Sequence, residues 1–142
     1  MERLQFEEWV LKVDISKTKE VYSTIHFNNE VLEWLNYIQV ISLSEPELFD
    51  FFNRFGMDML KPSQLSYHRV DENTMMMYSG SYHVCGELLV GEIDGWDVVI
   101  GNHCFSITED FEAIPNQMQG SVVEISFEAV LPWILDIPIH AK

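Results

Sequence analysis

Polar and apolar residues alternate over the first part of the chain. Apolar residues recur at every second position from Trp9 to Ile15, with charged residues on the opposite face. A period of two predicts a half-buried strand. The alternation returns over Val21–Phe27, after a polar stretch at Ser16–Lys19 that is typical of a turn. These residues therefore predict an opening β-hairpin.

The apolar spacing then changes to the period of a helix. Asn28 and Asn29 are good helix N-caps, and apolar residues recur after them at three- and four-residue intervals as far as Ile41. A second apolar stripe runs from Leu48 to Phe55 and stops at Gly56, a residue favoured just beyond helix ends. The spacing predicts two consecutive helices, at about 29–41 and 45–55.

Beyond Pro62 the pattern returns to period two and is interrupted by turn residues. Strands are expected at 65–70, 74–78, 81–89, 96–100, 105–107 and 123–131, with a hairpin turn at Asp94-Gly95. Helices and strands are segregated along the chain rather than alternating. We therefore expect an α+β fold in a single domain spanning 1–142. The sheet, or sandwich, would be predominantly antiparallel, with the two helices packed on it.

Charge divides the chain unevenly. Its 142 residues include 8 Lys+Arg and 23 Asp+Glu, which give a net charge of −15. From Val70 to Ala141 there are 12 acidic residues and no Lys or Arg. Such a surface repels phosphate backbones and anionic lipids, so we expect neither nucleic-acid nor membrane binding. It attracts a basic protein partner, although acidic surfaces also serve solubility alone.

Cysteine and histidine usage limits the chemistry. The chain begins without the basic-then-apolar pattern of a secretion signal, so we expect a cytoplasmic location with reduced thiols. His83, Cys85, His103 and Cys104 carry donor atoms suited to zinc. Adjacent residues of a strand point to opposite faces, so His103 and Cys104 would not converge. We therefore expect no metal and no cofactor.

The candidate binding residues are Tyr82, His83, Glu87, Asp94, Trp96 and Asp97. The first three lie in the central strand region, where a histidine and a carboxylate in one pocket would suit binding or acid–base work. The last three lie in a turn, where an aromatic side chain between carboxylates would anchor a partner. The turn also resembles a calcium loop, but it lacks the alternating acids of an EF-hand.

Three stretches resemble a family of small bacterial proteins with no assigned activity. They are Phe55–Asp58 with Lys61-Pro62, Tyr78–Glu87, and Val123–Leu135, which ends Leu131-Pro132-Trp133-Ile134-Leu135. The central family motif has the form Gly-x-Tyr-His-x-x-Gly, and the resemblance covers roughly residues 28–136. His83 matches that motif, whereas Cys85 stands where the family usually has valine. The paired cysteines that many members have near Leu32–Tyr37 are missing, so no metal or redox role is implied.

No catalytic signature is present, and the sequence does not define the oligomeric state. We therefore expect a non-catalytic acidic binding protein that recognises a basic protein partner, as immunity proteins and antitoxins do. The alternative is an enzyme, or a small-molecule or metal binder, with a pocket near His83 and Glu87.

Overall fold

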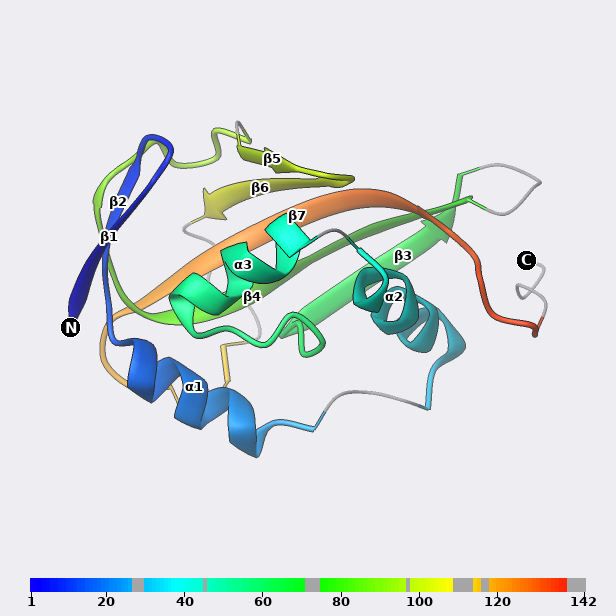
Figure 1. The fold of residues 1–142 in the computed structure, drawn as a ribbon, viewed down its shortest axis with the longest axis horizontal. Helices are drawn as coiled ribbons and strands as arrows, with labels where there is room; N and C mark the ends of the chain where they lie inside the picture. Colours follow the sequence, from blue (N-terminus) through cyan, green and yellow to red (C-terminus); the bar gives the residue numbers. More distant parts are fainter. Residues whose placement is uncertain are drawn as a thin grey trace.

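The computed structural model describes residues 1–26, 30–44, 46–70, 75–96, 98–108, 114–115 and 118–137. Over these ranges the chain is α+β, with one antiparallel sheet of seven strands and three helices (Figure 1). The strands are β1 (Glu2–Phe6), β2 (Trp9–Val13), β3 (Gln64–Arg69), β4 (Met75–Val90), β5 (Val98–Ile100), β6 (His103–Thr108) and β7 (Val122–Pro132). The helices are α1 (Ile15–Thr24), α2 (Leu32–Ser42) and α3 (Pro46–Phe55). None of the helices in these ranges is long and apolar enough to cross a membrane.

Strand β4 is the centre of the sheet. The strand order is β1-β2-β4-β7-β6-β5, and β3 also pairs with β4. One edge of β4 pairs with β7 from Met75 to Cys85. The other edge is shared by two strands. β3 pairs with β4 residues Met76–Ser81, and β2 pairs with β4 from Gly86 onward. A strand of 16 residues therefore has a gap between two partners on one edge.

Helix α1 fills this gap with side-chain hydroxyls. The Tyr22 hydroxyl donates to the carbonyl oxygen of His83 at 2.9 Å and accepts from the His83 amide at 3.0 Å. The Thr18 hydroxyl accepts from the amide of Cys85 at 3.1 Å. Thr18 and Tyr22 are four residues apart, so a helix presents both on one face. Buried backbone groups that would otherwise lack partners are thereby satisfied.

Helix α1 also corrects the predicted architecture. The sequence predicts two helices, whereas the described residues contain three. The additional helix is α1, which occupies the place of the predicted second hairpin strand, since residues 21–25 lie in or just after it. The side chain of Asp14 caps the helix by accepting from the Lys17 amide at 3.0 Å, so the polar stretch begins a helix rather than a turn. The opening hairpin is instead β1 with β2.

The other helix boundaries are close to prediction. Helix α2 starts at Leu32 and not at 29, with Val31 as its N-cap, and Asn28 and Asn29 lie outside the described residues. Helix α3 runs to Phe55 as expected, and Gly56 follows it with φ +80°, where glycine is favoured. Asp94-Gly95 is not a hairpin turn, since β5 pairs with β6 and not with β4.

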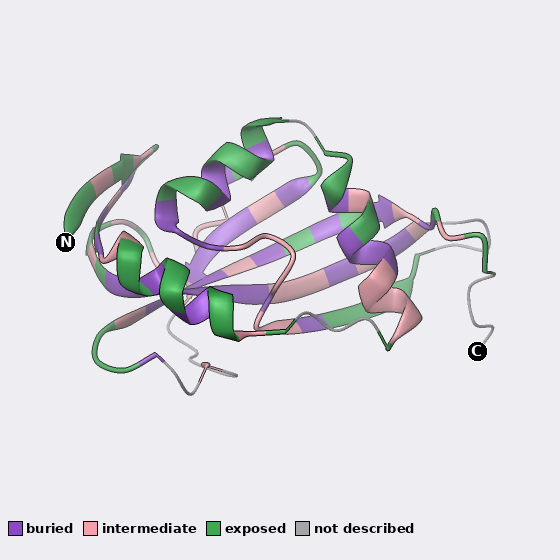
Figure 2. Ribbon diagram, turned by 60° about the horizontal axis from the view of Figure 1, so that its bottom comes forward, coloured by how far each residue is buried: buried purple, intermediate pink, exposed green. Residues whose placement is uncertain are grey.

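Aromatic side chains fill the core between the helices and one face of the sheet, which we call the inner face. The ring of Phe51 lies 4.5 Å from that of Phe105, and the ring of Phe52 lies 4.5 Å from that of Tyr82. Tyr37 of α2 stacks on Phe127 at 5.4 Å. Figure 2 shows the helices buried on the side that meets the sheet and exposed on the other. Burial of these rings stabilises the packing of the helices on β4, β6 and β7.

A hydrogen-bonded chain crosses this core. The Tyr82 hydroxyl donates to the carbonyl of Met59 at 2.7 Å, so it accepts from the Tyr37 hydroxyl at 2.8 Å. Tyr37 in turn accepts from Nε2 of His103 at 3.1 Å. His103 therefore carries a proton on Nε2. Burial lowers the pKa of His103 to about 4, since a charged imidazole would lose its hydration.

Replacing Tyr22 with phenylalanine tests the role of helix α1. Tyr22→Phe leaves the His83 amide and carbonyl without their partner on that edge, and the two lost hydrogen bonds should cost about 2–4 kcal/mol. The free energy of unfolding in urea measures this loss. Tyr67→Phe is the matched control, because Tyr67 is 38% exposed and should change stability by less than about 0.5 kcal/mol. Equal effects of the two substitutions would contradict the proposed gap-filling role.

Replacing His103 with glutamine tests the core histidine. An unfolded histidine has a pKa near 6.5 and the folded one about 4, so protonation favours the unfolded chain as the pH falls between these values. The wild type should therefore lose on the order of 2 kcal/mol more stability than His103→Gln between pH 7 and pH 5. Urea unfolding at both pH values gives the difference, with the exposed His68→Gln as control. Parallel losses in wild type and His103→Gln would refute the assignment.

Candidate functional site

The opposite face of the sheet, which we call the outer face, is polar at its centre. Three rows of directly paired residues cross it from strand to strand. These rows are Ser66–Ser79–Glu128–Cys104, Gln64–Ser81–Ser126–Ser106, and His83–Glu124–Thr108. Polar residues here alternate with the apolar residues of the inner face along β4, β6 and β7. Several of them are nevertheless buried, namely Ser81, His83, Ser106 and Glu124.

A line of hydrogen bonds runs through the third row. The Ser63 hydroxyl lies 2.8 Å from Nδ1 of His83, and Nε2 of His83 lies 3.0 Å from Oε1 of Glu124. The hydroxyl of Thr108 donates to the other carboxylate oxygen of Glu124. Ser126 extends the line, with its hydroxyl 3.0 Å from that of Thr108. The carboxylate of Glu124 is thus held at both oxygens.

The direction of each proton is set if the Glu124 side chain accepts at both of its oxygens. A carboxylate only accepts, so His83 donates from Nε2 and accepts from Ser63 at Nδ1. Burial lowers the pKa of His83 to about 4, so the imidazole is neutral near pH 7.

The row Ser63–His83–Glu124 has the residue types of a hydrolytic triad. However, His83 is 0% exposed, and neither Ser63 nor His83 lines any of the cavities described below. His83 therefore positions Glu124.

A polar cleft of about 460 Å³ lies over the outer face beside this row. Its lining residues include the serines Ser79, Ser81 and Ser126 and the acids Glu124 and Glu128. The hydroxyl of Ser81 is the informative group, because Ser81 is only 3% exposed and no described residue is within hydrogen-bond distance of its oxygen. A buried polar atom without a partner costs free energy that a bound ligand can recover.

The segment from Asp94 to Trp96 forms one wall of the polar cleft. It is held on β6, because the Asp94 amide donates to the carbonyl of Ile107 at 2.8 Å and Cys104 Sγ donates to the carbonyl of Trp96 at 3.2 Å. Asp94 and Trp96 have φ of 61° and 53°, in the left-handed region that side chains disfavour. These contacts therefore fix a carboxylate and an aromatic ring at the cleft in a conformation that costs energy.

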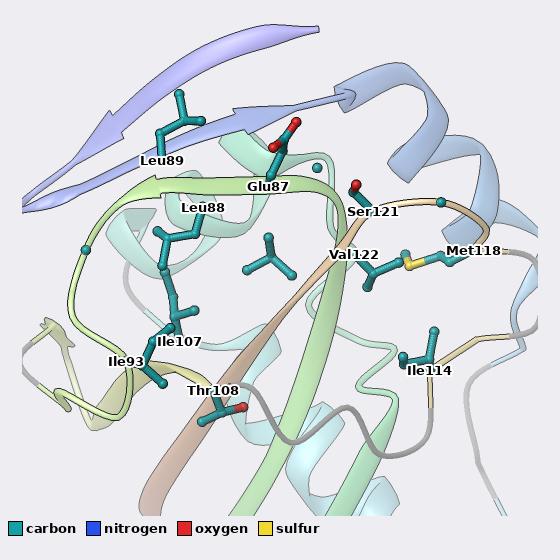
Figure 3. A pocket seen from close by; sticks show the side chains of 14 residues that line it. Glu87, Leu88, Leu89, Ile93, Ile107, Thr108, Ile114, Met118, Ser121 and Val122 are labelled. Atoms are coloured by element: carbon teal, nitrogen blue, oxygen red, sulfur yellow. The ribbon is translucent and has the colours of Figure 1, made fainter.

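A second, larger and apolar cavity of about 780 Å³ lies next to the polar cleft. Figure 3 shows it between β4, β6 and the start of β7, with Leu88, Ile107 and Val122 around the hollow. The side chain of Glu87 points away from the hollow in this view. Thr108 lines both the apolar cavity and the polar cleft, so the two are adjacent.

The predicted binding residues are distributed over three places. Asp94 and Trp96 line the polar cleft, together with Glu124 to which His83 is bonded. Glu87 lies at the apolar cavity and not beside His83. Tyr82 lies on the inner face, within the aromatic core, and its ring does not face the same side of the sheet as His83. Asp97 lies outside the described residues.

Sequence reasoning missed the residues that make the cleft polar. The alternation along 123–131 places Glu124, Ser126 and Glu128 on one face, which the structure confirms. Glu124 is nevertheless buried, with only 4% of its surface exposed. Ser63 and Ser81 have no local signal, because each acquires its role from a strand distant in sequence. Only the register between β3, β4 and β7 would reveal them.

The cysteines and histidines do not converge. His103 faces the helices, whereas Cys104, paired with Glu128, lies on the outer face. In the described part of the chain, no group of three or more His, Cys, Asp or Glu side chains is arranged to hold a metal ion. Neither Cys85 nor Cys104 forms a disulfide with the other, and burial raises the pKa of Cys85. A raised pKa disfavours the thiolate that nucleophilic chemistry needs.

Comparisons with protein-family models, with curated proteins and with solved structures find no match to the chain. The resemblance at Tyr78–Glu87 therefore stays a prediction, and the function is argued from the geometry of the site.

The protonation state of His83 can be tested directly. We expect a neutral imidazole with the proton on Nε2 at pH 7, because Glu124 accepts at one side and Ser63 donates at the other. Nitrogen-15 NMR of the imidazole distinguishes this tautomer from the Nδ1–H form and from the cation. Ser63→Ala should leave Nδ1 unsatisfied and cost about 1–2 kcal/mol of stability. A charged ring or an Nδ1–H tautomer would contradict the assignment.

Proposed function

We propose that the protein binds a basic protein partner and that the polar cleft receives an arginine or lysine side chain of that partner. The observation that carries the proposal is Ser81, a lining residue of the cleft whose hydroxyl is buried and has no partner among the described residues. A cluster of acids alone would be a solvated surface. A buried polar atom that lacks a hydrogen bond indicates a group supplied from outside.

The composition of the cleft indicates a cation. Carboxylates of Asp94, Glu124 and Glu128 line it, and no Lys or Arg is among its described lining residues. Carboxylates and hydroxyls accept hydrogen bonds, and a guanidinium offers five N–H donors in a planar fork. The ring of Trp96 adds an aromatic surface on which a cation can pack. The cleft is therefore suited to a donor-rich positive group.

Long-range charge supports the same partner. The 12 acidic residues between Val70 and Ala141 are not offset by any Lys or Arg in that stretch. Such a field increases the rate of encounter with a positive surface, and salt screens it. An immunity-type inhibitor of a basic protein is one form this function would take.

The geometry supports binding over the enzymatic alternative. An acid–base pair of His83 and Glu87 would need both side chains in one pocket, but Glu87 lines the apolar cavity and His83 lines neither space. A general base must be within reach of the proton that it removes. The buried imidazole bonded to Ser63 and Glu124 instead supports a fixed carboxylate for ligand binding.

A side-chain mimic tests this proposal. N-acetyl-arginine amide should perturb the NMR signals of Ser81 and of the Trp96 indole in a saturable way, whereas the neutral isostere N-acetyl-citrulline amide should not. Glu128→Gln removes one cleft charge and should weaken arginine binding about threefold, since Glu128 is exposed. Glu20→Gln, the same change at an exposed acid on α1, should leave binding unchanged.

Ser81→Ala separates binding from stability. Removal of an unsatisfied buried hydroxyl should leave the free protein as stable or more so, but it should weaken arginine binding. Binding of both amides alike, or arginine affinity that Ser81→Ala and Glu128→Gln leave intact, would refute the proposed function.

A further inference from the structure

We infer that the apolar cavity binds a small neutral ligand with an aliphatic chain. This site is separate from the polar cleft, and it does not depend on the proposed function. Three features of the molecule support it: the opening of the sheet at the end of β4, the side chains around that opening, and the charges near it.

The cavity lies where the sheet opens between β4 and β7. The two strands pair as far as Cys85 and Val122. Just beyond, the Gly86 amide donates to the carbonyl of Ser121 at 3.0 Å. Strand β4 then continues to Val90 with β2 as its partner, and no described strand pairs with its other edge there. Figure 3 shows β4 bending away from β7 around the hollow.

The segment that follows β4 closes the opening against β6. Ile93 forms a bridge with Ile107, and the Asp94 amide donates to the carbonyl of Ile107 at 2.8 Å. Strand β6 itself pairs with β7 as far as Thr108, which lies opposite Glu124. Backbone hydrogen bonds therefore hold both ends of the opening, and the hollow cannot collapse without breaking some of them.

Aliphatic side chains surround this hollow. Its volume of about 780 Å³ is far larger than the voids of a close-packed interior and is within the range of pockets for small ligands. An aliphatic chain that displaces water from such a lining is favoured. The buried members of the lining are Ile107, Met118 and Val123, and the half-buried members are Leu88, Ile93, Ile114 and Val122.

The polar residues of the lining do not select a charged ligand. The side chain of Glu87 points away from the hollow (Figure 3), and Ser121 is exposed. The hydroxyl of Thr108 already bonds to Glu124 and lies 3.0 Å from that of Ser126. A cation would therefore lose its hydration without meeting a carboxylate directed into the hollow.

The charge of the surrounding chain excludes an anionic head group. No Lys or Arg is among the described lining residues of the cavity. The stretch from Val70 to Ala141, which includes all of those lining residues, has 12 acidic residues and no Lys or Arg. A fatty-acid carboxylate would be repelled and would find no counter-charge. A neutral head group, such as the hydroxyl of an alcohol, avoids both costs.

The 1-alkanols from butanol to octanol test this inference with the full chain. Each methylene that enters the cavity should increase affinity about two- to fourfold in saturable NMR titrations. Octanoate carries a chain of the same length with a negative charge. At pH 7 it should bind at least about tenfold more weakly than octanol, because the cavity offers no cation to it.

A larger side chain at Val122 tests the location of the site. Val122 lines the cavity and is half-buried, so Val122→Phe should occupy part of the hollow and weaken octanol binding at least about tenfold. Val130→Phe is the matched control. It makes the same change on β7 at a residue that is 41% exposed and is not among the cavity's lining residues, and it should change affinity by less than about twofold.

Three results would overturn the inference: no saturable binding of any alkanol, octanoate affinity equal to that of octanol, or octanol affinity that Val122→Phe leaves unchanged. If Val122→Phe does not fold, nuclear Overhauser effects in the wild type decide. The terminal methyl group of octanol should contact Ile107 and Val123, and contacts only with residues outside the cavity lining would overturn the site. Binding of N-acetyl-arginine amide at the polar cleft is measured separately, so either proposal can fail while the other stands.

Discussion

One edge of strand β4 determines how the rest of this structure is arranged. Strands β3 and β2 each pair with part of that edge, and the backbone between them lies in the buried interior. Unpaired amide and carbonyl groups there would cost several kcal/mol, so the gap has to be closed. Helix α1 closes it with two hydroxyls, from Thr18 and Tyr22, and this requires a helix where the local alternation alone suggests a strand.

The same edge connects the fold to the candidate site. Tyr22 holds the backbone of His83 through two hydrogen bonds, and the ring of His83 holds Glu124 on the neighbouring strand. Thr108 on β6 then holds the second oxygen of that carboxylate. A helix on one side of the sheet thus determines the position of a carboxylate on the other side. The carboxylate is fixed before any ligand arrives, so binding does not have to pay for ordering it.

Prediction from the sequence succeeded where one segment contains the whole signal. The apolar stripe of α3 and the alternation of β7 each specify their own element, and segregation of helices from strands indicates the α+β class. It failed for α1 because Val21, Ser23 and Ile25 fit a strand, and only the distant edge of β4 favours a helix. The residues of the candidate site also fall into those that the local sequence indicates and those that it does not. Asp94 and Trp96 stood out in their turn, whereas Ser81 and Glu124 depend on strand register and on the segment that covers them.

An unsatisfied hydroxyl beside fixed carboxylates would be a poor choice for stability alone. Alanine at position 81 would remove the cost, and Ser81 pairs across β4 and β7 with Ser126, where a small apolar residue would also fit the sheet. The arrangement is reasonable if a donor-rich cation occupies the cleft for part of the protein's lifetime. The acidic C-terminal half then attracts such a group, and the hydroxyl and carboxylates accept hydrogen bonds only from a group whose donors reach them. Charge accordingly governs the rate of encounter, while the geometry around Glu124 governs which cation stays.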